Sequence, residues 1–207
     1  PQQFVAGYFD RSPVTRNTMV NIPTLKRIRI QFAGERLDLG VGRVADYVRT
    51  LDLRSAVSER AFTWTSPRGR ITKIRVVSFL SYVRRHVYAT ELSIRPVNWS
   101  GRVELEDVFD GTGQTLHQTH FKGTGHGDLE TGHYCEIRTL TSRLQAVLAC
   151  SYETSFPIRA LEQAASTRDG QVVRKALSFA VRRGRNALLR RYAAVATDFD
   201  QEAGKQA

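Results

Sequence analysis

Residues 59–80, ERAFTWTSPRGRITKIRVVSFL, decide how this chain folds. The first part carries Phe62 and Trp64, bulky aromatic side chains of the kind that strands favour. Ser66–Gly69 then has the chemistry of a β-turn, because proline presets φ at the second position and glycine suits the fourth. Residues 71–80 are expected to pair back on the first part. The stretch therefore predicts an antiparallel hairpin.

Strand patterns also lie on both sides of this hairpin. Residues 26–32 place Ile28, Ile30 and Phe32 on one face and charged or polar side chains on the other, as a half-buried strand does. Short strands at this spacing, with few helical stretches between them, predict an antiparallel β-sandwich over residues 1–155. The further expected strands are 36–39, 87–94, 102–106, 134–140 and 144–152.

The last quarter of the chain has a different pattern. Val173, Leu177 and Val181 recur at helical spacing with arginines on the other faces, and Gly184 divides or kinks this stretch. Residues 156–207 are therefore expected to form a strand and helical segment. The predicted fold class is mainly β, an antiparallel sandwich with a C-terminal helical segment.

The chain is strongly basic, with a formal net charge of +11. Of its 31 Lys and Arg residues 26 are Arg, a bias that codon usage in a GC-rich genome can produce without any phosphate-binding design. A dense arginine cluster could bind nucleic-acid phosphates, but aromatic side chains for base stacking are sparse beside it. We expect an Arg-rich outer helix face and no nucleic-acid partner, and keep nucleic-acid binding as an alternative. The cluster consists of Arg182, Arg183, Arg185, Arg190 and Arg191.

The two cysteines, Cys135 and Cys150, are too few for a disulfide framework and too far apart for a zinc motif. We expect both to be reduced and buried in strands, which favours a cytoplasmic protein. No run approaches the ~18 apolar residues of a membrane span, so no membrane partner is expected. Since the first residue is Pro1 and not Met, we expect the chain to be part of a longer polypeptide.

A Gly/Thr/His-rich stretch at residues 111–133 is predicted to be a long loop, and loops of this length are usually functional. Its histidines could hold a metal ion with Asp128 or Glu130, but the fixed helical spacing of a motif such as H-E-x-x-H is absent. We favour a loop that contacts a partner, and predict no metal and no cofactor. The histidines are His117, His120, His126 and His133.

Catalytic motifs are not evident. Paired carboxylates serve glycoside hydrolysis, but Glu104 and Glu106 alternate with apolar residues, and the acidic cluster at residues 104–110 is expected to be a solvated sheet face. No nucleophile motif such as G-x-S-x-G is present. Trp64 and Trp99 could form a sugar-stacking platform, but core positions are the preferred prediction. We therefore expect no catalytic residue in this chain.

Several phrases, taken in order, resemble the N-terminal domain of glycoside hydrolase family 65. That family includes maltose, trehalose, kojibiose and nigerose phosphorylases and some trehalose hydrolases. The phrases are Phe4–Asp10 (FVAGYFD), Val20–Pro23 (VNIP), Leu37–Gly40 (LDLG), Asp46–Asp52 (DYVRTLD), Phe79–Ser81 (FLS), Ile94–Gly101 (IRPVNWSG) and Phe109–Gly111 (FDG).

The resemblance implies a super-sandwich of the galactose-mutarotase type, whose first strands are missing here, followed by a helical linker and an (α/α)6 barrel. In such enzymes the barrel carries the general acid and the site for phosphate or water. The reaction is inverting cleavage of an α-glucosidic disaccharide such as trehalose or maltose. Residues 1–155 would then be a non-catalytic domain and residues 156–207 would lead toward the barrel. Inorganic phosphate would be a co-substrate of the parent enzyme only.

The resemblance also implies partners and a site. The domain would pack on its own barrel, shape the mouth of the substrate pocket and support a homodimer. Asp110-Gly111 matches a family phrase, and the His-rich stretch follows it directly, so residues here are candidates for the substrate rim. A stand-alone carbohydrate-binding module is an alternative. The rim candidates are Asp110, Gly111, His117, His120 and His126.

Overall fold

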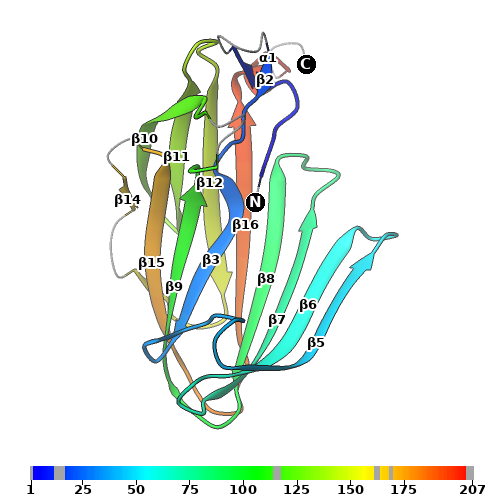
Figure 1. The fold of residues 1–207 in the computed structure, drawn as a ribbon, viewed down its shortest axis with the longest axis vertical. Helices are drawn as coiled ribbons and strands as arrows, with labels where there is room; N and C mark the ends of the chain where they lie inside the picture. Colours follow the sequence, from blue (N-terminus) through cyan, green and yellow to red (C-terminus); the bar gives the residue numbers. More distant parts are fainter. Residues whose placement is uncertain (1, 12–16, 114–117, 161–163, 168–169, 204–207) are drawn as a thin grey trace.

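The computed structural model describes residues 2–11, 17–113, 118–160, 164–167 and 170–203, which form almost entirely antiparallel strands (Figure 1). The first eight strands are β1 Phe9–Asp10, β2 Thr18–Met19, β3 Thr24–Phe32, β4 Glu35–Arg36, β5 Arg43–Asp52, β6 Val57–Thr65, β7 Ile71–Leu80 and β8 Val87–Pro96. The remaining elements are β9 Gly101–Asp110, β10 Phe121–Leu129, β11 Gly132–Thr139, β12 Gln145–Thr154, β13 Arg159–Ala160, β14 Ala165–Ser166, β15 Val172–Val181, β16 Ala187–Thr197 and α1 Asp198–Ala203.

The strands form two large sheets. The eight-stranded sheet has the order β10-β11-β12-β16-β8-β7-β6-β5, and the six-stranded sheet has β13-β15-β9-β3-β4 with β14 also paired to β15. Strands β1 and β2 form a separate pair. This architecture confirms the predicted mainly β, antiparallel sandwich.

Strands β6 and β7 form the hairpin that was predicted from residues 59–80. Gly69 donates its N–H to the carbonyl of Ser66 over 2.9 Å, and its φ of 78° lies where glycine is favoured. Both tryptophans are core residues, as predicted. Trp64 donates its indole N–H to the carbonyl of Val41 (2.9 Å), and Trp99 donates to a buried threonine hydroxyl (2.9 Å).

The prediction of helices near the C-terminus was wrong. Residues 172–181 and 187–197 are strands, and the helical segment is only Asp198–Ala203. In β16, alternate residues face the core, but one of these positions is the fully buried Arg191. A charged residue in a core position breaks the period-two pattern of apolar residues. The spacing of the neighbouring Leu and Tyr residues therefore resembled that of a helix. No helix in the described ranges is long and apolar enough to cross a membrane.

The predicted loop at residues 111–133 is also partly wrong, because residues 121–129 form strand β10. Its glycines suggested a loop, yet the sheet requires one of them. A Cβ at Gly123 would lie 2.5 Å from the Cα of Gly170, so only glycine permits this close approach of two backbone segments. Gly123 therefore reflects packing rather than a turn.

The eight-stranded sheet extends beyond the sheet that covers it. In the six-stranded sheet, β3 is the last long strand, and the edge strand β4 has only two residues. Strands β5, β6 and β7 stand apart from β3 and β9 on the right of Figure 1, and most of β5 is exposed. We call strands β5–β8 the overhanging half and strands β10, β11, β12 and β16 the covered half.

Candidate functional site

The predicted rim residues begin at the end of β9. The Asp110 carboxylate pairs with Arg27 and accepts a hydrogen bond from the Thr112 hydroxyl (2.7 Å). Gly111 donates its N–H to the carbonyl of Gln171 over 2.8 Å. His117 lies outside the described residues. The role of Asp110 and Gly111 at a substrate rim stays a prediction.

The other histidines of the stretch lie in different surroundings. His120 is buried, with Nδ1 3.7 Å from a carboxylate oxygen of Asp10. His126 is exposed on β10, whereas His133 is fully buried on β11. The described histidines therefore do not converge on the metal site considered from the sequence.

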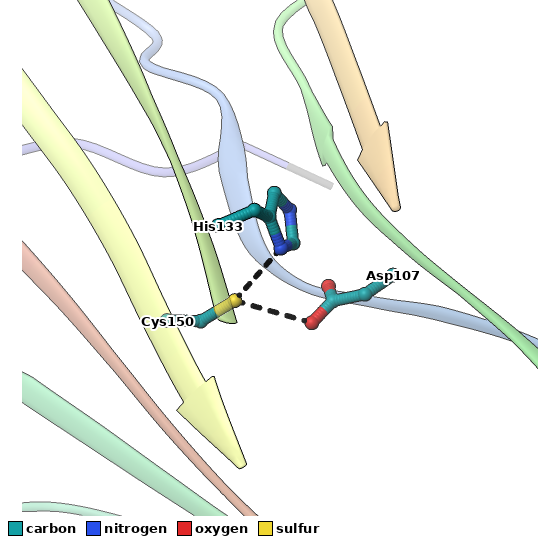
Figure 2. Close-up of side chains that lie close together, drawn as sticks. All are labelled: Asp107, His133 and Cys150. Atoms are coloured by element: carbon teal, nitrogen blue, oxygen red, sulfur yellow. Dashed lines mark hydrogen bonds between the residues drawn. The ribbon is translucent and has the colours of Figure 1, made fainter. Parts of the chain in front are cut away.

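A buried polar cluster instead brings His133 to Asp107 and Cys150, from three strands (Figure 2). The sulfur of Cys150 lies 3.2 Å from His133 Nδ1 and 3.4 Å from Asp107 Oδ2. His133 and Cys150 are direct partners in the register of β11 and β12, so their side chains share one face. The Tyr152 hydroxyl donates to Asp107 Oδ2 over 2.7 Å.

Arg191 completes the cluster from β16. Its Nε and Nη2 donate to the two carboxylate oxygens of Asp107 at 2.5 and 2.8 Å, and Nη1 donates to the carbonyl of Leu25. The side chains of Arg191 and Asp107 are only 1% and 2% exposed. The cluster therefore ties β9 and β3 of one sheet to β16 of the other through a bidentate ion pair.

Sequence reasoning missed this ion pair because Arg191 was assigned to an outer helix face and Asp107 to a solvated sheet face. The missed signal was the alternation along β16, where Ala187, Leu189, Ala193 and Val195 are in phase with Arg191. A charged residue at an inward position indicates a buried partner on another strand.

Burial and the ion pair shift the pKa values in this cluster. Burial alone would raise the pKa of Asp107, but the Arg191 guanidinium outweighs it and holds that pKa below its usual range. Burial lowers the pKa of His133 to about 4 and raises the pKa of the Cys150 thiol to about 12. At neutral pH the cluster therefore contains a charged Asp–Arg pair, a neutral imidazole and a neutral thiol.

His, Cys and Asp are ligand types of transition metals, and the donor atoms here lie within 4.8 Å of one another. The arrangement fits a hydrogen-bonded cluster better than a cation cage. The Arg191 guanidinium occupies both carboxylate oxygens, and a metal ligand must be a deprotonated thiolate, which burial disfavours. We assign the cluster a structural role.

A groove lies where the overhanging half leaves the six-stranded sheet. Its volume is about 820 Å³, and it is lined by β3 on one side and by β5–β8 on the other. Lys26, Arg49, Arg60 and the buried Arg191 line it, and none of the lining residues in the described chain is acidic. The groove is therefore a positively charged surface.

An apolar patch lies at one end of the overhanging half, on the turns that follow β5 and β7. Leu53, Tyr82 and Val83 are 84%, 87% and 91% exposed, and Leu51 and Leu80 at the adjoining strand ends are 61% and 64% exposed. We call these five residues the tip patch. Groups of exposed apolar side chains at one end of a domain mark interaction surfaces more often than single ones do.

The family model described as glycosyl hydrolase family 65, N-terminal domain, matches residues 1–207. The chain is 31% identical over 160 residues to the kojibiose phosphorylase of Halothermothrix orenii, which covers 77% of this chain and 20% of that protein. It is 28% identical over 150 residues to the α,α-trehalose phosphorylase of Geobacillus stearothermophilus, covering 67% and 20%. The chain thus spans about a fifth of the length of these relatives.

A solved structure shares the fold. It is a human-microbiome protein provisionally assigned as a kojibiose phosphorylase, with a TM-score of 0.74 and 18% sequence identity. The match covers 98% of this chain and 27% of that one. The likeness supports the arrangement of sheets described above.

Proposed function

Because the chain belongs to the N-terminal domain family of glycosyl hydrolase family 65, we propose that it is the non-catalytic β-sandwich of a larger enzyme that acts on α-glucosidic disaccharides. The parent enzyme would invert the anomeric centre, with phosphate or water as the attacking group. The observation that carries the proposal is the match of the family model to residues 1–207, and the chain covers only about a fifth of the length of the relatives it matches. The relatives' own names are kojibiose and trehalose phosphorylase.

The domain's role would be to pack on the catalytic domain, shape the mouth of its pocket and support a dimer. The tip patch is the surface that suits such a contact, because Leu53, Tyr82 and Val83 expose nearly all of their apolar area to solvent. Burying these side chains against a partner would stabilise the contact by about 25 cal/mol for each Å² of apolar surface removed from water.

The test of this role uses the parent polypeptide and the 207-residue chain side by side. Replacing Leu53, Tyr82 and Val83 by Ser should leave the unfolding of the 207-residue chain unchanged, because these side chains pack on little of their own domain. The same replacements should lower the melting temperature of the parent enzyme. Val147→Ser, a 39% exposed apolar residue on β12, is the control. An unchanged melting temperature of the triple variant would refute the contact.

The non-catalytic role has its own test. The 207-residue chain should release no glucose from kojibiose or trehalose with or without phosphate, and should show no heat of binding with either sugar. Activity would overturn the proposal. Binding without activity would instead favour a carbohydrate-binding module.

The rim residues are tested in the parent enzyme. Asp110→Ala and His126→Ala should raise KM for the disaccharide if this part of the domain faces the pocket, while kcat stays the same. An unchanged KM in both variants would remove these residues from the rim.

A further inference from the structure

The inner face of the overhanging half, taken together with the adjoining strand β16 of the covered half, changes character along its strands. The register places whole rows of side chains across the sheet, and the row nearest the core is apolar: Phe62, Ile74, Ile94 and Ala187. Two residues further along, the row is Arg49, Arg60, Val76, Leu92 and Leu189. Two residues further again, it is Leu51, Ser58, Ser78, Thr90 and Arg191. The inward face thus passes from core to cationic to hydroxyl-bearing.

Arg49 and Arg60 are direct cross-strand partners on β5 and β6, and both line the groove. Like charges directly opposite each other destabilise a sheet. Within the described ranges neither guanidinium forms an ion pair, and both residues are exposed. On the outer face of β6 and β7, by contrast, Arg75 is held by Glu59 at 2.6 Å. The inner pair is thus an uncompensated concentration of positive charge.

Lys26 adds a third cation from β3, across the groove. Its ammonium lies 5.3 Å from the centre of the Tyr88 ring, and it too forms no ion pair among the residues that the structure describes. The cations therefore come from both walls of the groove.

The hydroxyls of Ser58, Ser78 and Thr90 stand side by side on β6, β7 and β8 and line the same groove. In the described part of the chain, none of these hydroxyls is used in a hydrogen bond to protein. Neighbouring strands are about 4.8 Å apart, so the hydroxyl row spans about 10 Å. Each hydroxyl can both donate and accept, as the hydroxyls of a polyol also can.

We propose that this groove binds a phosphate monoester of a polyol, with the phosphate between Arg49 and Arg60 and the polyol along the hydroxyl row. Arginine binds phosphate oxygens through paired N–H donors, and a phosphate monoester carries close to two negative charges at neutral pH. It would therefore compensate both guanidiniums. The volume of about 820 Å³ is within the range of ligand pockets.

An acidic polypeptide segment is the competing occupant. Each of its carboxylates carries a single charge, and it would leave the continuous hydroxyl row without a matching set of partners. The combination of a double cation with three free hydroxyls in one groove therefore favours the phosphorylated polyol.

The test is calorimetric titration of the 207-residue chain with glucose 6-phosphate, inorganic phosphate and glucose at low ionic strength. Glucose 6-phosphate should bind, inorganic phosphate should bind more weakly, and glucose should not bind detectably. Arg60→Ser should lower the affinity for glucose 6-phosphate at least tenfold. Ser78→Val should lower the affinity for glucose 6-phosphate but leave the affinity for inorganic phosphate unchanged. Circular dichroism checks that each variant is folded.

The control is Arg95→Ser, which removes one cation from the outer face of β8, where Arg95 is the register partner of Lys73. It should leave the affinity unchanged. Equal weakening by Arg95→Ser and Arg60→Ser would show attraction by net charge alone and would overturn the proposal. Failure of glucose 6-phosphate to bind would also overturn it, and binding of polyglutamate in its place would assign the groove to acidic polypeptides.

Discussion

The two halves of the eight-stranded sheet have the same strand geometry but different inner faces. In the covered half the inward residues pack against the six-stranded sheet, and Cys135, Ile137 and Leu148 are at most 1% exposed. In the overhanging half, corresponding inward positions carry Arg60 and Ser78. The alternation therefore identifies which face of a strand points inward, while the chemistry of that face shows whether another layer covers it.

The two halves also differ in whether their inward-facing arginines have ion-pair partners. Arg191 in the covered half is fully buried and donates from Nε and Nη2 to the two carboxylate oxygens of Asp107. Arg49 and Arg60 in the overhanging half face each other without a described ion-pair partner. The buried charge is compensated inside the fold, whereas the charge in the groove has no described counter-charge.

The largest effect is expected from breaking the buried ion pair. Asp107→Asn should lower the free energy of unfolding by about 3–5 kcal/mol, because it leaves the Arg191 guanidinium buried without a counter-charge. Urea denaturation measures this loss in the free energy of unfolding. Arg190→Met, which removes an exposed pair with Glu91, should leave the free energy of unfolding almost unchanged. Similar small losses in both variants would contradict the distinction between the buried and the exposed ion pair.

Core truncation should separate the halves next. Leu148→Ala in the covered half should cost about 2–4 kcal/mol, since the side chain is fully buried and leaves a cavity. Ser78→Ala on the inner face of the overhanging half should change the free energy of unfolding by less than about 0.5 kcal/mol. The same denaturation experiment compares them, and an equal cost at both sites would mean that both faces are covered.

The covered half should also make stability depend on pH. The pKa of His133 is lowered to about 4 in the folded chain, so the unfolded chain takes up a proton between about pH 6.5 and 4 while the folded chain does not. Stability is complete above that window and falls by about 3 kcal/mol as pH drops through it. His133→Gln should flatten this slope, whereas His126→Gln should not. A flat profile in the unmodified chain would contradict the buried neutral imidazole.

The reactivity of thiols compares directly how accessible the two inner faces are to a reagent. Of the experiments described, it should change the stability of the fold least. Cys150 is 2% exposed, and burial raises the pKa of its thiol to about 12, so an aromatic disulfide reagent should modify it only after unfolding. The thiol introduced by Ser78→Cys should react in the native state. Slow reaction at both positions would show that the groove is closed.

Much of the fold follows from local sequence. The strands at residues 57–65 and 71–80 and the turn between them agree with the prediction because their side chains alternate and their turn residues are specific. Both cysteines are free and buried in strands, as expected. These features depend on neighbouring residues alone.

The failures arise where distant residues meet. Strand β16 was taken for a helix because Arg191 occupies a core position, and its partner Asp107 is 84 residues away in the sequence. The cross-strand pair of Arg49 and Arg60 was missed for a similar reason, since only the register of β5 and β6 places them together. Sequence patterns indicate faces, whereas these sites depend on strand pairing.

The most direct test of the account is a pair of readings on the variant Arg60→Ser, namely its free energy of unfolding and its affinity for glucose 6-phosphate. Removing one of two opposed like charges should leave the free energy of unfolding unchanged or raise it by a few tenths of a kcal/mol, while the affinity falls at least tenfold. A loss of more than about 1 kcal/mol in stability with unchanged affinity would show that Arg60 serves the fold and not a ligand.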